Sequence, residues 1–523
     1  MSSTRSVAKE LPLLLQTVDL QTALEDDENM LQKLTYPGLR DDFMHYLFAR
    51  RSDIEAIVAR HLGLCTGSCQ VAEEGWLHGS FNLCIPVNIR DPHYAARRVL
   101  FRIPLPYKTG EMKYPGNSEE KLRCEVATYV WMQQNCPTVP IPNLLGFGFA
   151  DGLGFSPLPA APFVHRMFWY ARCILLSIFC RSLPCAYVKQ TLPKLGHGYM
   201  ILEYVEEASA SMLSKTWSDF RHDDTRRANL FRDMSRINLT LACQPLPHIG
   251  SLRIDDQGFL HLSNRPLTLR LQHLENEGIP THIGRDQVYF TSESYVLDLL
   301  ACYDNKLRYQ PNSVLDKFDG CAQMAAITVM RATHPHYLQR GLRRGPFILT
   351  LTDLHQSNIF VDQDWNIKYI IDLEWACSQP VDMLRAPYWL TDRPVDSLLP
   401  DDGLEEFSKT HNEFLEIFEQ EEKAIRKAES HRLLFCHSLA GIIRNGLENG
   451  SFWFFYALEN PKGLFSLFFY HLMPRYGDST NPNFYDVMSA YWDVNAANVV
   501  ERKLKDKEDY EANLRKAFTG DDP

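Results

Sequence analysis

The sequence predicts a protein of the α+β class, in which a smaller strand-rich part is followed by a larger helical part. Short apolar runs bounded by turn residues predict β-strands between residues 69 and 103, and another buried strand at residues 199–205. After residue 206 the apolar residues recur mostly with helical spacing. The chain has 523 residues, of which 45% are hydrophobic and 12% aromatic, so it can bury a large core and is not disordered as a whole.

The charge and the cysteines narrow the class of partner and the compartment. The formal net charge is -11, from 54 basic and 65 acidic residues, which argues against a nucleic-acid partner and against a polybasic membrane-surface protein. The 13 cysteines are odd in number and form no Cys-x-x-Cys pair, so neither a disulfide scaffold nor a zinc site is expected. Reduced thiols in a cytoplasmic protein are the simplest interpretation.

No segment is expected to span a membrane or to act as a secretory signal. The apolar run at residues 11–15 is short and contains Pro12. The most apolar stretch, residues 167–180, is too short to cross a bilayer and has Arg172 in its middle. We interpret it as a buried or partner-facing helix, with contact to a membrane as the alternative.

The composition divides the chain into four segments. A boundary near residue 206 separates the strand-rich part from the helical part, and the strand-rich part contains an insertion rich in proline, leucine and aromatic residues. The segments are an N-terminal helical extension (1–60), the strand-rich part (61–205, with the insertion at about 151–196), the helical part (206–500) and a charged C-terminal tail (501–523).

Each early element has a local signal. Residues 53–60 have helical spacing, with Asp53 as a candidate cap, and Gly63 ends that helix. Pro86 lies in the second of three predicted strands, which indicates an edge strand or a bulge. The three strands are predicted at residues 70–72, 83–89 and 99–103.

A well-signalled helix follows these strands. Asn117 can cap it, and Glu120 lies three residues further on, which is the spacing of a capping box. Glu125 lies within the apolar arc of this helix, where a carboxylate normally needs a cationic partner. The alternative is a carboxylate at the rim of the arc that reaches solvent. The apolar arc consists of Leu122, Val126, Tyr129 and Met132.

The most informative stretch covers residues 346–380 and reads PFILTLTDLHQSNIFVDQDWNIKYIIDLEWACSQP. A predicted strand runs into a polar cluster that contains Asp353 and Asn358. A short apolar hairpin follows, turned at residues 364–366, and its second arm ends in Asp372.

This arrangement suits phosphoryl transfer, which needs an oriented alcohol, Mg²⁺ on the phosphates and stabilisation of charge. Asp353 can accept the proton of the alcohol, and Asn358 and Asp372 offer the hard oxygen ligands that Mg²⁺ prefers. The two apolar arms between them would hold the ligands rigidly. The alternative is that Asp353 and Asn358 only make hydrogen bonds within a turn.

On these residues the sequence resembles the aminoglycoside phosphotransferase and choline-kinase-like family, and most of all its fungal group. The family's usual stretch is His-Gly-Asp-x-His-x-x-Asn followed by Ile-Asp-Trp-Glu. Residues 351–358 here read LTDLHQSN and residues 371–374 read IDLE. The chain departs from the pattern at Leu351 and Thr352. The resemblance covers roughly residues 60 to 420.

The resemblance implies a bilobal protein-kinase-like fold, with a small strand-rich ATP lobe and a larger helical lobe that binds the phosphate acceptor. It implies that Asp353 is the catalytic base and that Asn358 and Asp372 bind Mg²⁺. Glu374 is a group near the metal or only part of the turn. His355 is expected to make structural hydrogen bonds.

The same resemblance places the nucleotide in the small lobe. Gly79, Ser80 and Asn82 match a phosphate-covering turn, although a tight hairpin explains these residues equally well. Arg102 stands where the family has a lysine that holds phosphates, with Lys108 and Lys113 as alternatives and an exposed surface arginine as the other interpretation. A pair between Arg102 and Glu125 would be the counterpart of the Lys–Glu pair of kinases.

The connection between the lobes is expected at residues 202–205. The backbone carbonyl of Glu203 and the N–H of Val205 are candidates for pairing with an adenine edge. The same sequence pattern is found wherever a buried strand is followed by an acidic turn.

The sequence therefore predicts a Mg²⁺-dependent phosphotransferase that moves the γ-phosphate of ATP to a hydroxyl of a small molecule. One alternative is a catalytically silent pseudokinase that acts as a binding module, which Leu351 and Arg102 permit. A protein kinase is a weaker alternative, because no Asp-Phe-Gly or Ala-Pro-Glu text occurs at or after Asp372. The acceptor and the oligomeric state cannot be read from the sequence.

Overall fold

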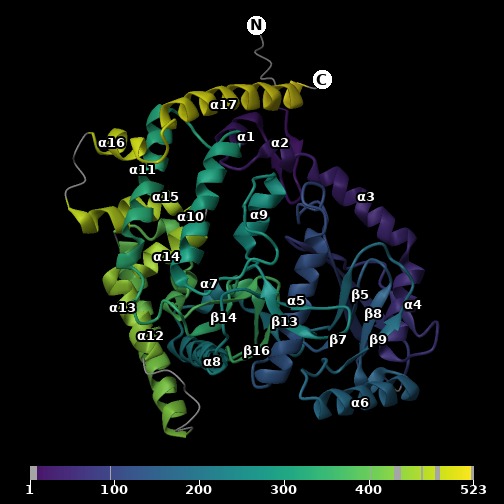
Figure 1. Cartoon of the computed structure of the whole chain (residues 1–523). Coiled ribbons are helices and arrows are strands. Elements are labelled where there is room, and N and C mark those ends of the chain that lie inside the picture. Colours follow the sequence, from purple (N-terminus) through teal and green to yellow (C-terminus); the bar gives the residue numbers. More distant parts are fainter. Residues whose placement is uncertain are drawn as a thin grey trace.

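The computed structural model has a strand-rich lobe and a helical lobe, which lie side by side in Figure 1. This confirms the expected two-lobed α+β architecture. Among the described residues, no helix is both long and apolar enough to cross a membrane. The structure describes residues 9–92, 94, 96–400, 402–428, 438–460, 463–477 and 483–519.

One antiparallel sheet forms the strand-rich lobe. Its eight strands, counted over the described residues, have the order β3-β5-β6-β10-β7-β8-β9, with β4 also paired to β5. The strands are β3 (Cys69–Val71), β4 (Leu77–His78), β5 (Asn82–Ile89), β6 (Arg98–Pro104), β7 (Leu144–Gly148), β8 (Leu153–Pro157), β9 (Tyr187–Thr191) and β10 (Tyr199–Glu203). The three predicted strands are confirmed as β3, β5 and β6.

The prediction from Pro86 is wrong, because β5 is an inner strand and keeps an even register with β6. On its other side, β3 pairs with Val87 to Ile89, and β4 pairs with Leu83 and Cys84. Pro86 falls in the gap between these two partners, where an N–H would meet no strand. Its carbonyl still accepts a hydrogen bond from Ala72 N at 2.9 Å.

The long helix α5 (Asn117–Asn135) is confirmed, but its predicted cap is not. The carboxylate of Glu111 accepts from Gly116 N and Ser118 N, both at 2.7 Å, and so caps the helix from outside. Asn117 is buried inside the first turn, where its side chain donates to Thr109 O and to Glu275. The predicted apolar arc of α5 is fully buried.

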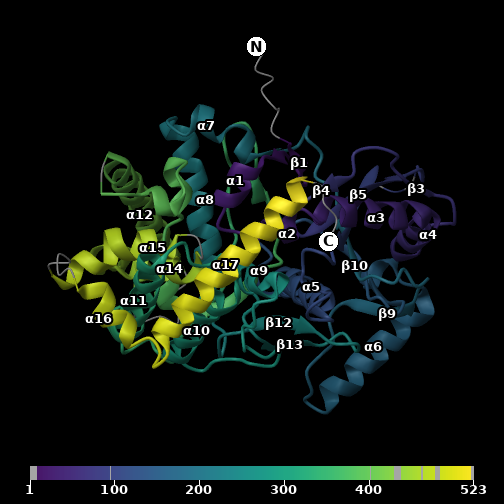
Figure 2. The ribbon, with the colours of Figure 1, turned by 90° about the horizontal axis from the view of Figure 1, so that it is seen from above.

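The insertion at about 151–196 contains secondary structure of its own. It supplies the helix α6 (Phe163–Ile178) and the strands β8 and β9. The two strands extend the sheet to its edge. In both views α6 lies at the outer rim of the strand-rich lobe (Figures 1 and 2).

The N-terminal residues are mainly helical and cover two regions. α3 (Tyr36–Ala49) and α4 (Arg51–Leu62) pack on one face of the sheet, and Gly63 ends α4 with a φ of 68°. Asp53 lies in the first turn of α4 and pairs with Arg50 instead of capping the helix. α1 (Leu20–Glu25) and α2 (Met30–Lys33) pack against α17 (Ala496–Thr519), which crosses the top of Figure 1.

The charged C-terminal segment has a buried side. Tyr510, Leu514 and Phe518 of α17 form a small apolar cluster with Val18, Ala23 and Met30. The two ends of the chain therefore stabilise each other through apolar contact.

The helical lobe shares one continuous apolar core with the inner face of α5. Its helices are α7 (Trp217–Phe220), α8 (Asp224–Ala242), α9 (Leu269–Glu277), α10 (Ser292–Tyr309), α11 (Lys317–Thr333), α12 (Asp402–Ala428), α13 (Leu439–Asn449), α14 (Ser451–Glu459), α15 (Leu464–Leu467) and α16 (Phe484–Ala490). Its strand pairs are β12 (Ser251–Ile254) with β13 (Leu260–Asn264), β14 (Phe347–Leu351) with β17 (Ala376–Pro380), and β15 (Ile359–Val361) with β16 (Ile367–Ile370).

Candidate active site

Two strand pairs bring the polar residues of the 346–380 stretch together. In the first pair Leu351 of β14 lies opposite Ala376 of β17, and in the second Ile359 of β15 lies opposite Ile370 of β16. The loop that follows β14 and the loop that precedes β17 therefore lie at the same end of this strand pair. These loops carry Asp353, Asn358 and Asp372, so the structure brings the three predicted residues to one end of both strand pairs.

Asp372 follows β16 in an unusual backbone conformation. Its φ is 63°, in the left-handed region that L-residues rarely adopt. The neighbouring Ile371 N donates to Asn358 O at 3.0 Å, which fixes the two loops to each other. Strain of this kind persists where the surrounding structure imposes it, and it is concentrated at functional sites.

Asn358 is buried and held by its amide nitrogen. Nδ2 donates to the backbone carbonyl of Asp353 at 2.9 Å and lies 3.3 Å from His355 Nε2. His355 Nδ1 in turn accepts from Ser357 N at 3.2 Å. These contacts leave the amide oxygen of Asn358 available to a cation, and they give His355 the structural role that was expected.

Asp353 has the pKa of a useful base. Burial, followed by repulsion from Asp372 and Glu374, raises the pKa of its carboxyl to about 7. A general base works best when its pKa lies near the operating pH. The loop that carries Asp353 is fixed by a hydrogen bond at the preceding residue, where Thr352 Oγ1 donates to Trp375 O at 2.7 Å.

A buried cluster of charges lies beside Asp372. Arg102 of β6 forms the predicted ion pair with Glu125 of α5, with Nη1 3.1 Å from Oε1. Its other nitrogen, Nη2, contacts Asp372 and lies 2.9 Å from Glu374. Burial alone would raise the pKa of Asp372, but the pairing with Arg102 outweighs it and holds the pKa below its usual value.

Lys121 is the site residue that sequence reasoning missed. Its side chain is completely buried, and Nζ lies 2.5 Å from Glu374 and 3.7 Å from Glu125. The alternatives Lys108 and Lys113 lie elsewhere, over the ring of Tyr36 and against Asn276 O. The sequence could have indicated Lys121, because it lies one helical turn before Glu125 on α5 and next to the apolar arc.

The turn at residues 79–82 contacts the charged cluster through the side chain of Asn82. Gly79 N donates to Asn82 O at 2.9 Å, which closes a tight turn. The Asn82 side chain points inward, accepting from Lys121 Nζ at 2.8 Å and donating to Glu374 at 2.5 Å. Ser80 at the tip is exposed, while Phe81 packs edge-on against Trp375 of the helical lobe.

The two adenine candidates lie at the connection between the lobes. The Glu203 carboxylate accepts from Asn143 Nδ2 at 2.7 Å and from the Tyr369 hydroxyl at 3.2 Å. Its side chain therefore ties the connection to both lobes, because Tyr369 belongs to β16. Val205 follows in the loop and is half-buried.

A cavity of about 430 Å³ opens in the helical lobe and reaches Asp353. Its volume is typical of a small-molecule site. A second, much smaller space of about 10 Å³ lies between Asp353 and Asp372 and is lined by both. Four residues line both spaces, Leu351, Thr352, Asp353 and Leu354, and Asp353 is the charged one among them.

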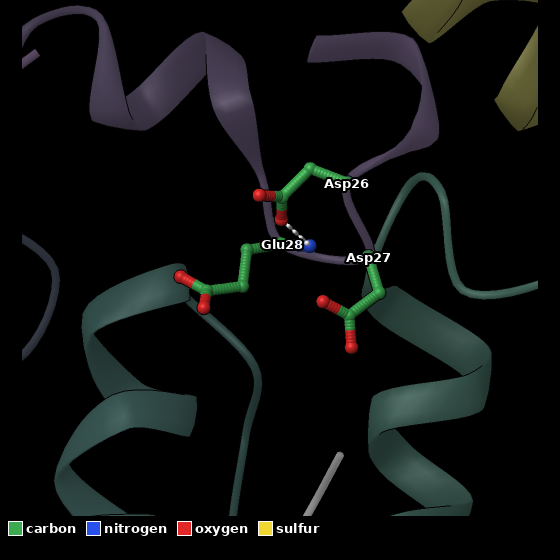
Figure 3. Close-up of side chains that lie close together, drawn as sticks. All are labelled: Asp26, Asp27 and Glu28. Atoms are coloured by element: carbon green, nitrogen blue, oxygen red, sulfur yellow. Dashed lines mark hydrogen bonds between the residues drawn. The ribbon is translucent and has the colours of Figure 1, made fainter. Parts of the chain in front are cut away.

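The far end of the large cavity is acidic. Asp27 and Glu28, from the turn between α1 and α2, and Glu277 at the end of α9 line it. Figure 3 shows the carboxylates of Asp27 and Glu28 on the same side of the turn, while Asp26 accepts from Glu28 N. Burial raises the pKa of Glu277 to about 7. Altogether five carboxylates and three Lys or Arg side chains line the cavity, so carboxylates outnumber the cations when all of them are ionised.

The residues present fit a magnesium ion at Asp372. Asp372 and Asn358 offer oxygen donors from adjoining loops, which are the ligands that Mg²⁺ prefers. Glu125, Asp372 and Glu374 also place carboxylate oxygens within 4.8 Å of one another. However, Arg102 and Lys121 already neutralise Glu125 and Glu374, so these two carboxylates are better matched to the buried cations than to the ion.

No protein-family model and no curated protein match the chain. Among solved structures, it is similar to a thermostable mutant of aminoglycoside phosphotransferase APH(4)-Ia, in ternary complex with AMP-PNP and hygromycin B. The identity is 10% and the TM-score 0.33, over 86% of this chain and 98% of that chain.

Two further solved structures are similar to the chain. Macrolide 2′-phosphotransferase type I has 12% identity and a TM-score of 0.35, over 85% of this chain and 97% of that chain. An ethanolamine kinase from Plasmodium vivax has 11% identity and a TM-score of 0.29, over 82% and 83%. Because these TM-scores lie below 0.5, the function of the chain is inferred from its own geometry.

Proposed function

We propose that this chain is a phosphotransferase that moves the γ-phosphate of ATP to a hydroxyl group of a small molecule held in the 430 Å³ cavity. One observation carries the proposal. A carboxylate with a pKa of about 7, Asp353, stands between that cavity and the cluster around Asp372. A base at this junction faces an acceptor on one side and a phosphate-binding group on the other.

The residues have distinct roles in the proposed reaction. Asp353 accepts the proton of the acceptor hydroxyl, whose oxygen then bonds to the γ-phosphorus as the bond to the ADP oxygen breaks. Asn358 and Asp372 would hold Mg²⁺, which supplies charge neutralisation on the phosphates. Arg102, held by Glu125 through Nη1, would donate to a phosphate oxygen through Nη2.

The remaining candidates would contact the rest of the nucleotide. The backbone at Gly79 and Ser80 would cover the phosphates, and Asn82 would link that turn to Lys121. The backbone carbonyl of Glu203 and the N–H of Val205 would pair with adenine at the connection between the lobes. Support from separate elements of both lobes is what positioning in phosphoryl transfer requires.

The proposal is tested by incubating the chain with ATP, Mg²⁺ and a library of hydroxyl compounds. The measurement is formation of ADP together with a phosphate monoester, followed by ³¹P NMR. Acceptor-dependent ADP formation that requires Mg²⁺ supports the proposal. ADP formation that no hydroxyl compound stimulates, and that EDTA does not stop, contradicts it.

A second candidate is a silent nucleotide-binding module, and the contact between Arg102 and Asp372 favours it. The guanidinium occupies one carboxylate oxygen that a metal would use. Thermal unfolding with ATP, with and without Mg²⁺, separates the two candidates when combined with the assay above. Stabilisation by ATP that is independent of Mg²⁺, without turnover, indicates the silent module.

The pH dependence of the reaction follows from the pKa of Asp353. Only the ionised carboxylate can accept a proton, so kcat/KM is expected to rise with pH through about 7 and then level off. Initial rates at saturating ATP between about pH 5.5 and 9 measure this profile. A flat profile over that range would contradict the assignment of the base.

The acidic end of the cavity is expected to select acceptors that carry a cationic group. Replacing Glu277 by Gln should raise KM for such acceptors about tenfold and leave kcat nearly unchanged, because the contact is equal in the ground and transition states. Neutral acceptors should be unaffected. The matched control is Glu25→Gln, which removes an exposed carboxylate near the same turn but outside the cavity. An equal effect on cationic and neutral acceptors would contradict the prediction.

A further inference from the structure

The helix α6 exposes its apolar side to solvent. None of its residues is buried, so the interpretation of this stretch as a buried helix is wrong. A surface helix normally turns its apolar stripe toward the core. Here the side chains with exposures of 53–72% recur at helical spacing and form one outward stripe: Phe163, Val164, Met167, Phe168, Ile174, Leu175 and Ile178.

The opposite side of α6 carries the groups that usually face water. Trp169 Nε1 donates to Cys185 O at 3.0 Å, and Arg172 donates to Gln257 O at 3.2 Å. Arg166 lies on the same inner side and is half-buried. The inner side of α6 is thus attached to the lobe by the two hydrogen bonds and by Arg172, which also lies over the ring of Phe259, while the apolar stripe faces outward. A segment built this way leaves its apolar stripe free for another surface.

The charge around α6 differs sharply from that of the whole chain. Residues 152–202 contain no Asp or Glu, although the chain has a net charge of -11. In the nearest acidic hairpin, Asp256 pairs with Arg123, and Asp255 accepts hydrogen bonds from Gln257 N and Phe259 N. The basic residues of the acid-free segment are Arg166, Arg172, Arg181, Lys189 and Lys194.

We propose that α6 docks the strand-rich lobe onto an anionic lipid surface, lying in the plane of the interface with its apolar stripe among the acyl chains. An interfacial helix combines a Phe-, Trp- and Leu-rich face with nearby basic residues in this way. Its 16 residues span about 24 Å, which is shorter than the hydrocarbon core of a bilayer, so α6 lies on the membrane rather than across it.

A lipid surface fits this stripe better than a protein surface does. Protein interfaces contain roughly one hydrogen bond per 100–200 Å². Seven of the outward side chains are apolar, and the exposed residues of α6 that carry a hydroxyl are Tyr170 and Ser177. Acyl chains need no such partner, and the absence of acidic residues over 51 positions matches anionic headgroups.

The proposal is independent of the proposed reaction. No residue of α6 lines the 430 Å³ cavity or the space between Asp353 and Asp372. Variants of the apolar stripe are therefore expected to leave turnover of a soluble acceptor unchanged while they alter membrane binding.

The test is flotation of the full chain with phosphatidylcholine vesicles that contain either no or about 30% phosphatidylserine. The full chain should float with the anionic vesicles, and less so as salt is raised. Phe168→Glu combined with Leu175→Glu should lower the bound fraction about tenfold or more. The matched control is Phe290→Glu, which changes a phenylalanine of similar exposure on the helical lobe. Circular dichroism and thermal unfolding establish that each variant is folded.

Three results would overturn the proposal. The first is equal binding to neutral and anionic vesicles. The second is no vesicle binding at all. The third is a dimer in sedimentation equilibrium that Phe168→Glu dissociates while vesicle binding is absent, which would make a second copy of the chain the occupant of the stripe.

Discussion

Replacing Asp353 by Asn is expected to lower phosphate transfer about a thousandfold, within the range that general-base catalysis contributes. The amide has nearly the same shape but cannot accept the proton of the acceptor hydroxyl. Because Asp353 is not among the ion-pair partners of Arg102, which are Glu125, Asp372 and Glu374, the affinity for ATP should change much less than the rate of transfer. The loss should therefore appear in kcat, with KM for ATP nearly unchanged.

Asp382 offers a matched control for this variant. Burial raises the pKa of its carboxyl to about 7 as well, and it accepts from Gln339 N at 3.1 Å, outside the cavity lining. Asp382→Asn should retain most of the turnover. If the two variants lost turnover equally, a general effect of buried carboxylates would replace the assignment of Asp353 as the base.

The stability of the Asp353 variant gives a second, independent readout. The folded pKa of about 7 lies above the value near 4 of an unfolded chain, so the ionised carboxylate opposes folding. That cost grows as pH rises through the window between these two values and is complete above the folded pKa. Relative to the native chain, Asp353→Asn should gain more in melting temperature at pH 8 than at pH 5. A gain that is equal at both pH values would mean that Asp353 is not held in this environment.

The local structure of residues 346–380 was predictable because it is encoded within the stretch itself. The spacing between Asp353 and Asn358, and the length of the hairpin that ends at Asp372, depend on local turns and strand alternation. The structure places the hairpin as predicted, in β15 and β16. What the sequence did not indicate is β17, whose pairing with β14 aligns the two ends of the stretch.

The charged cluster was only partly predictable because it depends on contacts between distant segments. The pair between Arg102 and Glu125 followed from the rule that a carboxylate in an apolar arc needs a cation. Lys121 did not, because a lysine at the edge of such an arc usually reaches solvent. Its partner Glu374 is 253 residues away in the chain, and only the packing of the two lobes excludes water from both.

The helix α6 shows the limit of reasoning from hydrophobicity. A stretch rich in Phe, Ile and Leu normally predicts burial, because burial of each such side chain contributes about 1.5–3 kcal/mol. Periodicity identifies which side of a helix is apolar, but not what that side contacts. In α6 the apolar side faces outward, since Trp169 and Arg172 bind the lobe from the other side.

Replacing Lys121 by Met is expected to destabilise the fold by about 3–5 kcal/mol, the usual cost of removing one partner from a buried ion pair. The change leaves Glu125, Asp372 and Glu374 with Arg102 as the remaining cation of the described cluster. Glu374 is only 2% exposed, so water cannot take the place of the lost ammonium. Denaturant unfolding at pH 8 measures the effect.

Lys503→Met is the matched control, because Lys503 is also completely buried. Its ion-pair partner Asp506 is 41% exposed and can be solvated after the change, so a smaller loss is expected. Burial, followed by repulsion from Asp372, raises the pKa of Glu374, and the loss of Lys121 should raise it further, so the deficit of Lys121→Met should shrink as pH falls toward 5. Adding Glu374→Gln should restore most of the lost stability, because the double variant removes both charges of the pair. A deficit that neither acid pH nor Glu374→Gln relieves would show that Lys121 supports the fold through packing alone, and the cluster beside Asp372 would then lose its electrostatic basis.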